Sequence, residues 1–282
     1  MAVTFLVHER LSLPLSAHID NLYYVQGVMP YRCEKVFPSP TFDLKINLGG
    51  AVGAVDDIST RAKYESSWCV GVWSRHHVVE WPEQAHFVGV SFKPGGAYAV
   101  LGIPLSDFHD RVVPLDEIWP RPFVEQIRDR LWMAGTPQNR LTLVEEILSS
   151  QLRGKRPGLN TVRYALSRIA RNDGTLTVRT LCEEIGISHR HFISLFRQVV
   201  GGTPKELARL YRFTAVLERM NAAEHVDLTS IAHEGHYFDQ SHFCKDFRAF
   251  TAETPTNYLR RLGRVRAESP DHSRHVRLMT VA

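Results

Sequence analysis

The sequence predicts an α+β protein, with a β-rich N-terminal domain that includes two helices and an all-α C-terminal domain. Short β-branched and aromatic runs, bounded by Pro and Gly, fill the first hundred residues or so. From about residue 160 onward, apolar residues recur at helical spacing between capping residues and glycines. We place the domains at 1–155 and 159–262, followed by a flexible tail at 263–282.

Length, composition and cysteine usage bound the class of protein. The 282 residues suffice for two domains, and 44% hydrophobic with 23% charged residues is typical of a globular protein. No run of 18 apolar residues occurs, and the first residues lack a basic segment with a long apolar one, so we expect no transmembrane helix and no secretory signal. The four cysteines form no Cys-x-x-Cys pair, so we expect a cytoplasmic protein in a reducing compartment.

Charge is distributed unevenly along the chain. Residues 1–157 carry 16 Lys+Arg and 17 Asp+Glu, a net charge of −1, whereas residues 158–282 carry 18 and 13, a net charge of +5. A modestly basic C-terminal part is compatible with a nucleic-acid partner, although charge alone does not establish one.

The N-terminal domain begins with predicted strands. Runs at 43–48, 68–73 and 86–92 are rich in β-branched and aromatic residues, and turn-forming Pro and Gly residues bound them. Strands of this length and spacing predict a small sandwich or barrel.

Two predicted helices follow, at about 121–133 and 138–152. The second has an apolar stripe made of Leu141, Val144 and Leu148. This stripe could pair two subunits, or it could pack on its own domain, and the sequence leaves both possibilities open.

The remaining chain is predicted to be helical after a charged linker at 152–158 that Gly and Pro interrupt. Ser, Thr and Asp are favoured N-caps, Pro suits the first helical position, and Gly often ends a helix. The first expected helix covers 159–170. The later ones, counted from their caps, are 177–185, 188–200, 203–221, 227–235, 239–251 and one that begins at Thr254-Pro255.

One segment of this helical region recurs at an interval of 51 residues. The segments 188–204 and 239–255 share His, Phe, Phe, Arg, Thr and Pro at matching positions. The shared pairs are His191 and His242, Phe192 and Phe243, Phe196 and Phe247, Arg197 and Arg248, Thr203 and Thr254, and Pro204 and Pro255. The chain therefore contains two copies of one structural unit.

Each unit follows the helix-turn-helix plan, in which a capped second helix enters the major groove of DNA with its N-terminal residues at base edges. Gln can bond adenine, Arg or Lys can bond guanine, and Ser hydroxyls and helix N-termini suit phosphates. The candidate DNA-binding residues are Ser188, His189, Arg190, Ile193, Ser194 and Arg197 in the first unit, and Gln240, Ser241, His242, Lys245 and Arg248 in the second.

Other interpretations of the helical region are weaker. The outward polar residues could simply be the solvent-exposed face of an ordinary helical domain. Two copies of the unit, each followed by Thr-Pro at the same offset, make this interpretation less favoured. A helical module that binds protein, attached to a β-barrel domain and with no DNA role, is the alternative function. An enzyme has little support because the chain has no P-loop, GxGxxG, HExxH or nucleophile–base motif.

Residues 165–262 resemble the AraC/XylS family of transcription regulators. The motifs that carry the resemblance are Leu181 to Ser188, Gly202-Thr203-Pro204, Ile231-Ala232, and above all Asp239-Gln-Ser-His-Phe243 with Phe247-Arg248 and Thr254-Pro255. The resemblance implies that a long helix, here about 204–221, joins two units that enter successive major-groove segments on one face of DNA. It also implies base-reading positions at Arg190, Ile193, Ser194, Gln240, Ser241 and Lys245.

Three positions depart from the family pattern. Ile193 replaces the usual polar reader and is suited to a thymine methyl group, or else the first unit reads fewer bases. His236 stands where the family has a turn glycine, so we expect a positive φ with modest strain, or a shifted turn. Cys182 replaces a small Ala, and we expect it to be buried.

The N-terminal domain resembles the poorly characterised sensor-type domain that precedes some of these helix-turn-helix pairs. Its marks are Phe92 to Ala97, Leu101 to Pro104 and Val113 to Trp119. By analogy, the resemblance implies a cupin-like β-structure that binds a small-molecule effector or mediates dimerisation. If a pocket exists, the residues expected to line it are Tyr64, Trp68, Trp73, Trp81 and Phe87, although aromatic residues at strand spacing more often form a core.

No cofactor or metal is expected. His76 and His77, with Glu80 and His86, contain metal-binding side chains, but neighbouring residues on a strand point to opposite faces. The expected partners are double-stranded DNA and, as the resemblance implies, a small-molecule effector, RNA polymerase and a second copy of the chain; no membrane contact is expected.

Overall fold

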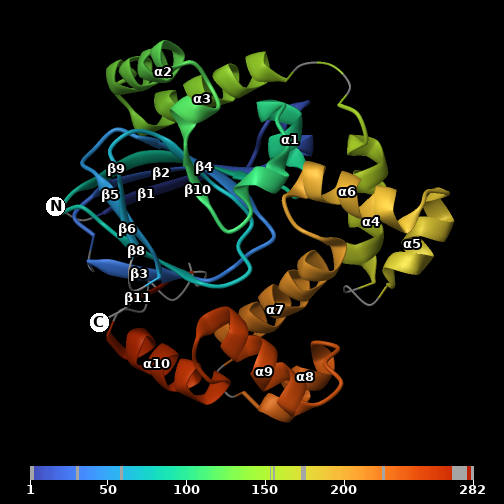
Figure 1. Ribbon diagram of the computed structural model, residues 1–282. Coiled ribbons are helices and arrows are strands. Elements are labelled where there is room, and N and C mark those ends of the chain that lie inside the picture. The colour runs from blue at the N-terminus through green and yellow to red at the C-terminus, as the bar shows by residue number, and fades with distance from the viewer. Residues whose placement is uncertain are drawn as a thin grey trace.

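The N-terminal domain is built on two antiparallel sheets that face each other (Figure 1). The computed structural model describes residues 3–29, 32–57, 60–152, 154, 156–172, 176–223, 226–268 and 278–280. The first sheet has the strand order β1 (Thr4–His8), β2 (Ile19–Gly27), β9 (Ala85–Phe92), β4 (Phe42–Asn47), β7 (Trp68–Val70) and β10 (Val112–Pro114). The second has the order β11 (Leu278–Thr280), β3 (Cys33–Val36), β8 (His77–Glu80), β5 (Val52–Asp57) and β6 (Thr60–Tyr64). This arrangement confirms the predicted β-rich domain.

The first sheet packs one face against helices. Along β4 and β9, Leu44, Ile46, Val88 and Val90 point to this side and are fully or almost fully buried. The covering helices are α1 (Gly96–Leu101), α2 (Arg121–Met133) and α3 (Pro137–Gln151), of which the last two match the predicted pair (Figure 1). The stripe of Leu141, Val144 and Leu148 is buried in this core, so it packs on its own domain.

The C-terminal helices begin and end close to the positions that the sequence predicts. They are α4 (Leu159–Arg171), α5 (Val178–Ile185), α6 (His189–Val200), α7 (Pro204–Ala222), α8 (Leu228–Glu234), α9 (Gln240–Thr251) and α10 (Pro255–Glu268). Side chains of the predicted caps Thr177, Ser188, Thr203, Asp227, Asp239 and Thr254 each accept a hydrogen bond from a helix amide. The part of the chain that the structure describes has no helix that is both long and apolar enough to cross a bilayer.

One hydrophobic core continues from the N-terminal domain into the first helix-turn-helix unit. Buried residues of α4, α5 and α6 belong to the same cluster as the covered face of the first sheet. The long helix α7 contributes Leu207 to this cluster, and Phe213 to a second cluster with α8, α9 and α10. Phe37 and Val72 of the N-terminal domain join that second cluster. The N-terminal domain therefore packs against both units.

The predicted boundaries at 155–159 and 262 lie within packed regions. In the linker, the Tyr98 hydroxyl donates to the carbonyl of Pro157 at 3.3 Å, and the Arg156 guanidinium bonds the carbonyl of Ala99 at 3.4 Å. Helix α10 continues past residue 262 to Glu268, and β11 pairs with β3. For residues 269–277 and 281–282, which lie outside the described residues, the flexible tail stays a prediction.

A glycine allows α6 to end against the N-terminal domain. Gly201 has a φ of 95°, and a Cβ atom there would lie 3.0 Å from the carbonyl oxygen of Leu105. Gly186 ends α5 with a similar φ of 76°, but a Cβ atom there would have no neighbour within 4 Å. Both glycines have a left-handed backbone, but only Gly201 lies close to another element, the carbonyl of Leu105.

We predict that Gly201→Ala lowers the free energy of unfolding more than Gly186→Ala does. The left-handed backbone costs an L-residue about 1–2 kcal/mol at either position, and Gly201→Ala must also push α6 away from Leu105. Urea unfolding of both full-length variants measures the difference. Equal destabilisation would show that the close approach at Gly201 contributes nothing.

Candidate nucleic-acid interface

The two capped second helices, α6 and α9, present the predicted DNA-binding residues to solvent. Each helix starts directly after its cap, and its first three residues are exposed. Exposed positions are Ser188, His189, Arg190, Ser194, Arg197, Gln240, Ser241, His242, Lys245 and Arg248, whereas Ile193 is half-buried. The inward rows of phenylalanines that orient these faces, Phe192 and Phe196 in α6 and Phe243 and Phe247 in α9, are fully buried.

Helix α9 is fixed in orientation by an ion pair with α7. The Arg209 guanidinium donates to the Asp246 carboxylate at 2.8 Å, and Asp246 is only 6% exposed. The same guanidinium lies over the Phe250 ring, 5.0 Å from its centroid. A hydrogen-bonded charge pair of this kind is geometrically specific, so it sets how the exposed face of α9 is turned.

Helix α6 is fixed instead by the N-terminal domain. It contacts η2 (Leu105–Phe108), a short 3-10 helix of that domain. Its Gln198 side-chain amide donates to the Tyr98 hydroxyl of α1 at 3.3 Å. At the start of α1, a Cβ atom on Gly95 would lie 3.2 Å from Val199. Helices α6 and α9 therefore have different anchors.

The turn of each unit follows the sequence expectations. Gly186 has a φ of 76° in the first turn, and His236 has a φ of 55° in the second, which confirms the predicted positive φ. Cys182 is buried, also as predicted. Burial raises the pKa of the Cys182 thiol, which fits an apolar packing role rather than a reactive one.

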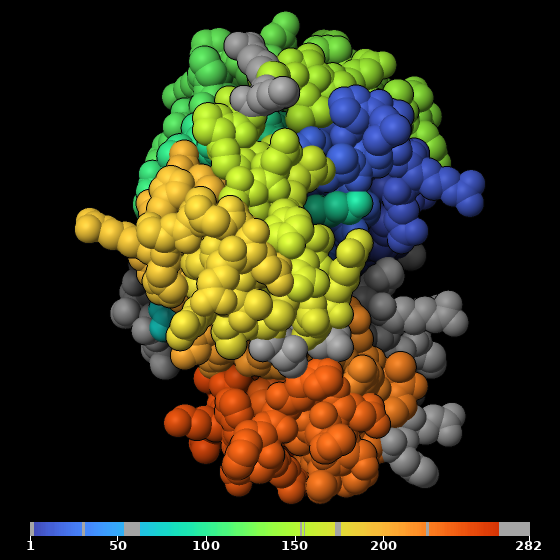
Figure 2. All heavy atoms as spheres, turned by 90° about the vertical axis from the view of Figure 1, so that its right-hand side faces the viewer, coloured from blue at the N-terminus to red at the C-terminus, as the bar shows by residue number. Residues whose placement is uncertain are grey.

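The long helix α7 spaces the two units on one side of the molecule. Its 19 residues span about 28 Å at 1.5 Å per residue, close to the roughly 34 Å between successive major-groove segments on one DNA face. Figure 2 shows the first unit, in yellow, above the second, in orange to red, on the same face.

One exposed aromatic residue beside α9 is missing from the sequence-based set. Phe238 precedes the cap Asp239 and is 93% exposed. It lies outside the apolar 3.6-residue pattern of α9, because it comes before the helix. The signal that could have identified Phe238 is its position: it is an apolar residue directly before the cap of α9.

The five predicted effector residues gather between the two sheets. Trp68 and Trp73 are buried, and Tyr64 and Trp81 pack against them in one small cluster. Phe87 belongs to a neighbouring cluster and stacks on Trp81, with 5.3 Å between ring centroids. The structure thus brings the set together, mostly as packed side chains.

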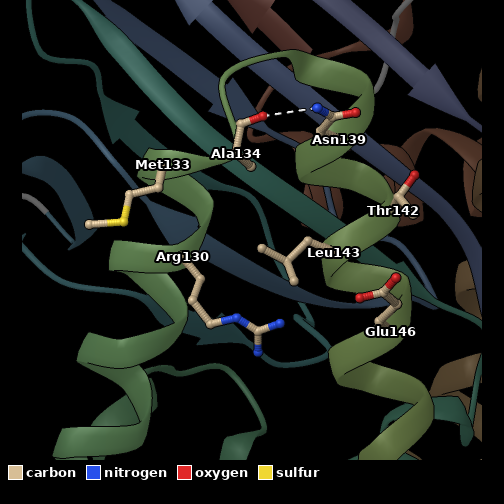
Figure 3. A pocket seen from close by; sticks show the side chains of 7 residues that line it. All are labelled: Arg130, Met133, Ala134, Asn139, Thr142, Leu143 and Glu146. Carbon is tan, nitrogen blue, oxygen red and sulfur yellow. Dashed lines mark hydrogen bonds between the residues drawn. The ribbon is translucent and has the colours of Figure 1, made fainter.

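A separate open groove of about 440 Å³ lies between α2 and α3 (Figure 3). Arg130 and Met133 line it from α2, and Leu143 and Glu146 line it from α3. None of the five predicted effector residues contributes to this groove.

The histidines considered for a metal site have different surroundings. The His77 ring packs on Trp73 with 4.4 Å between centroids, whereas Nε2 of His86 lies 3.0 Å from the Tyr24 hydroxyl. Among the described residues, no group of three or more His, Cys, Asp or Glu side chains is arranged to hold a metal ion.

A histidine joins the N-terminal domain to the start of α7. The two ring nitrogens of His109 lie 3.3 Å from Asp110 and 3.6 Å from Glu206. Glu206 also caps α7 by accepting the Thr203 amide at 2.7 Å, and Asp110 accepts the Ser74 hydroxyl at 2.6 Å. The link therefore connects a cap of α7 to a loop of the N-terminal domain.

The charges in this link reinforce one another. Hydrogen bonds to Asp110 and Glu206 raise the pKa of His109 to about 9. The hydrogen bond from His109 lowers the pKa of Glu206 to about 2. Burial alone would raise the pKa of Asp110, but hydrogen bonds from His109 and Ser74 outweigh it and lower that pKa to about 2.

We predict that this link stabilises the folded chain most between about pH 4.5 and 6.5. The raised pKa of His109 contributes stability that is complete below its unfolded value of 6.5 and is lost as pH rises through about 9. The lowered carboxyl pKa values contribute stability that is complete above 4.5 and is lost as pH falls through about 2. Because these groups are partly exposed, the contribution of His109 is about 1 kcal/mol or less.

Urea midpoints at pH 6 and pH 9 measure the alkaline half of this prediction. His109→Gln should reduce the difference between the two midpoints relative to the unmodified chain. An unchanged difference would mean that His109 does not carry the alkaline dependence.

Two protein families match different parts of the chain. Residues 181–261 match the family described as "Helix-turn-helix domain", and residues 12–114 match a family described as "Domain of unknown function (DUF6597)". No curated protein sequence matches the chain.

Several solved structures are similar in part. Apo ToxT from Vibrio cholerae is 13% identical over 90% of this chain and 96% of that chain, with a TM-score of 0.44. The C-terminal domain of AraT, a response regulator from Geobacillus stearothermophilus, is 22% identical over 36% of this chain and 84% of that chain, with a TM-score of 0.33. The AraC-like transcriptional activator CuxR is 15% identical over 75% and 86% of the two chains, with a TM-score of 0.25.

The family match covers both capped second helices, their turns, and the long helix between them. Residues 181–261 therefore form a helix-turn-helix domain.

Proposed function

We propose that this protein is a sequence-specific DNA-binding regulator of transcription, controlled by a small molecule that binds the N-terminal domain. The observation that carries the DNA-binding part is the pair of capped second helices, each with an exposed polar and basic N-terminal half on a buried phenylalanine row. This arrangement suits insertion of both helices into the major groove. The function is binding, not catalysis.

Each exposed side chain has a role that its chemistry suggests. Arg190 and Lys245 are suited to guanine edges, and Gln240 is suited to adenine. Arg197 and Arg248 lie toward the last turns of α6 and α9, where they are suited to phosphates. The half-buried Ile193 is suited to a thymine methyl group.

The remaining candidate residues assist at the helix starts. Ser188 accepts the His191 amide as a cap, yet its hydroxyl hydrogen stays available to a phosphate. His242 packs edge-on against Tyr237, with 5.4 Å between ring centroids, so its ring position is defined. His189, Ser194 and Ser241 complete the set, and Phe238 adds an apolar contact beside α9.

The proposed control begins in the N-terminal domain. Because that domain shares a core with α6 and also contacts the cluster around α9, a ligand that shifts it changes how the two reading helices are held. RNA polymerase and a second copy of the chain are the further partners that the family resemblance suggests.

We predict that Arg190→Ala and Lys245→Ala each weaken binding to a selected duplex by about 1–3 kcal/mol, because each removes a base contact. Arg121→Ala is the matched control, since this exposed arginine lies on α2 and pairs only with Glu125 among the described residues. Fluorescence anisotropy with a duplex selected from random DNA measures the affinities. Full affinity in both reader variants would remove these positions from the interface.

We also predict a steep dependence of duplex affinity on salt. If Arg190, Arg197, Lys245 and Arg248 neutralise phosphates or lie beside them, log K falls with log salt with a slope of about −3 to −4. Raising salt from 50 to 200 mM then weakens binding about 100-fold. A chain that selects no duplex from random DNA, or shows no salt dependence, would favour the alternative protein-binding module.

A further inference from the structure

The turn of the second helix-turn-helix unit is longer than the turn of the first. In both turns a residue with positive φ follows the first helix, Gly186 in one unit and His236 in the other. The amide of the next residue, Ile187 or Tyr237, then donates to a carbonyl of that helix, at 3.2 and 3.0 Å respectively. After this bond the first unit proceeds directly to the cap of α6, whereas the second unit inserts Phe238 before the cap of α9.

The inserted residue is left outside the core of the unit. Tyr237 takes the inward position that Ile187 partly fills in the first unit: it is 6% exposed, and its ring centroid lies 5.4 Å from those of His242 and Phe243. Phe238 has no such place and is 93% exposed, the highest value among the exposed large apolar residues of the described chain. Single exposed apolar side chains are common, so what matters is where Phe238 lies.

The backbone directs Phe238 to the side of the first reading residue of α9. Asp239 has a φ of −154° and a ψ of 172°, so the chain is extended through the cap. In an extended chain, side chains two residues apart point to the same side, which places Phe238 beside Gln240. The Asp239 carboxylate turns the other way, where it accepts the amide of His242 at 2.7 Å. The Phe238 ring therefore borders the surface that the first residues of α9 present.

This surface favours DNA over protein as the partner that covers the ring. The exposed residues around Phe238 in the turn and the first turn of α9 are polar: His236, Gln240, Ser241 and His242. An apolar protein surface placed over the ring would also desolvate these groups without bonding them. A duplex offers them base edges and phosphates. Because phenylalanine has only two side-chain torsions, covering it loses little conformational entropy.

The major groove contains one apolar group that suits this ring. It is the C5 methyl of thymine, which Phe, Ala and Thr side chains can contact. Apolar wedges that unstack base pairs act from the minor groove instead. Phe238 lies at the start of a helix that is suited to the major groove, so its position favours the methyl contact over the wedge.

We infer that Phe238 is a specificity-determining residue of the second unit, and that its ring contacts the 5-methyl group of a thymine next to the base pair that Gln240 reads. The first unit has no counterpart in its turn, because Ile187 packs against the core there. This inference rests on the DNA-binding role proposed above, and it names a base that the second unit selects.

Replacing thymine with uracil in a duplex selected by the full-length chain tests the inference, because uracil lacks only the methyl group. Fluorescence anisotropy measures the affinity as each thymine is replaced in turn. At one thymine, uracil should weaken binding about fourfold, as expected for the loss of one buried methyl group. The Phe238→Ala chain should bind the original duplex about fivefold or more weakly, and uracil at that same position should have no further effect on it.

Selection from random DNA with two variants locates the contact. Phe238→Ser should lose the preference for thymine at that position and keep the other preferences, and Gln240→Ala should lose the preference at the neighbouring base pair. Met133→Ala is the matched control, because this apolar residue is also exposed, at 82%, but lies on α2. Since the Phe238 side chain is almost fully exposed, its variants should unfold at the same urea concentration as the unmodified chain.

Full affinity in the Phe238→Ala chain, or a uracil effect that persists in it, overturns the inference. A Phe238→Ala chain that changes its oligomeric state in sedimentation but keeps full duplex affinity assigns the ring to a protein partner, which also overturns it. A chain that selects no duplex contradicts the proposed DNA-binding role itself, so the two failures are distinct.

Discussion

The packing of α6 against the N-terminal domain is the contact on which the rest of the structure depends. The first reading helix shares one core with the helix-covered face of the first sheet. Gly201 and Gly95 make that approach possible, because a side chain at either position would press on Leu105 or Val199. Dispersion contacts in such a core are short-ranged, so moving the sheet away from α6 would weaken them.

This contact makes the two reading helices unequal. Helix α9 is held within the C-terminal domain by the ion pair between Arg209 and Asp246, whereas α6 is held by the domain proposed to sense a ligand. Strand β4 contributes to this difference, because its Leu44 and Ile46 lie in the core that reaches α6.

Local signals allowed much of the C-terminal domain to be predicted. Caps such as Thr177 and Asp239 act within three residues, so sequence neighbours suffice to place helix starts. The positive φ of His236 followed from its turn position. The shared core could not be predicted, because it joins residues such as Leu105 and Val199 that are far apart in the chain. The alternation at Asp43 and Lys45 predicted a strand, but only the second sheet shows that these polar residues face inward. The pairing of β11 with β3 was missed for the same reason.

Native-state hydrogen exchange of the full-length chain tests the shared core most directly, because it measures the free energy of opening for each segment. If α6 and the N-terminal domain form one core, amides of His189–Val200 and of Gly96–Leu101 exchange with the same opening free energy, and Gly201→Ala lowers both together. Exchange of α6 at a distinctly lower free energy, with α1 unaffected by Gly201→Ala, would show that the two domains open independently and would contradict the account.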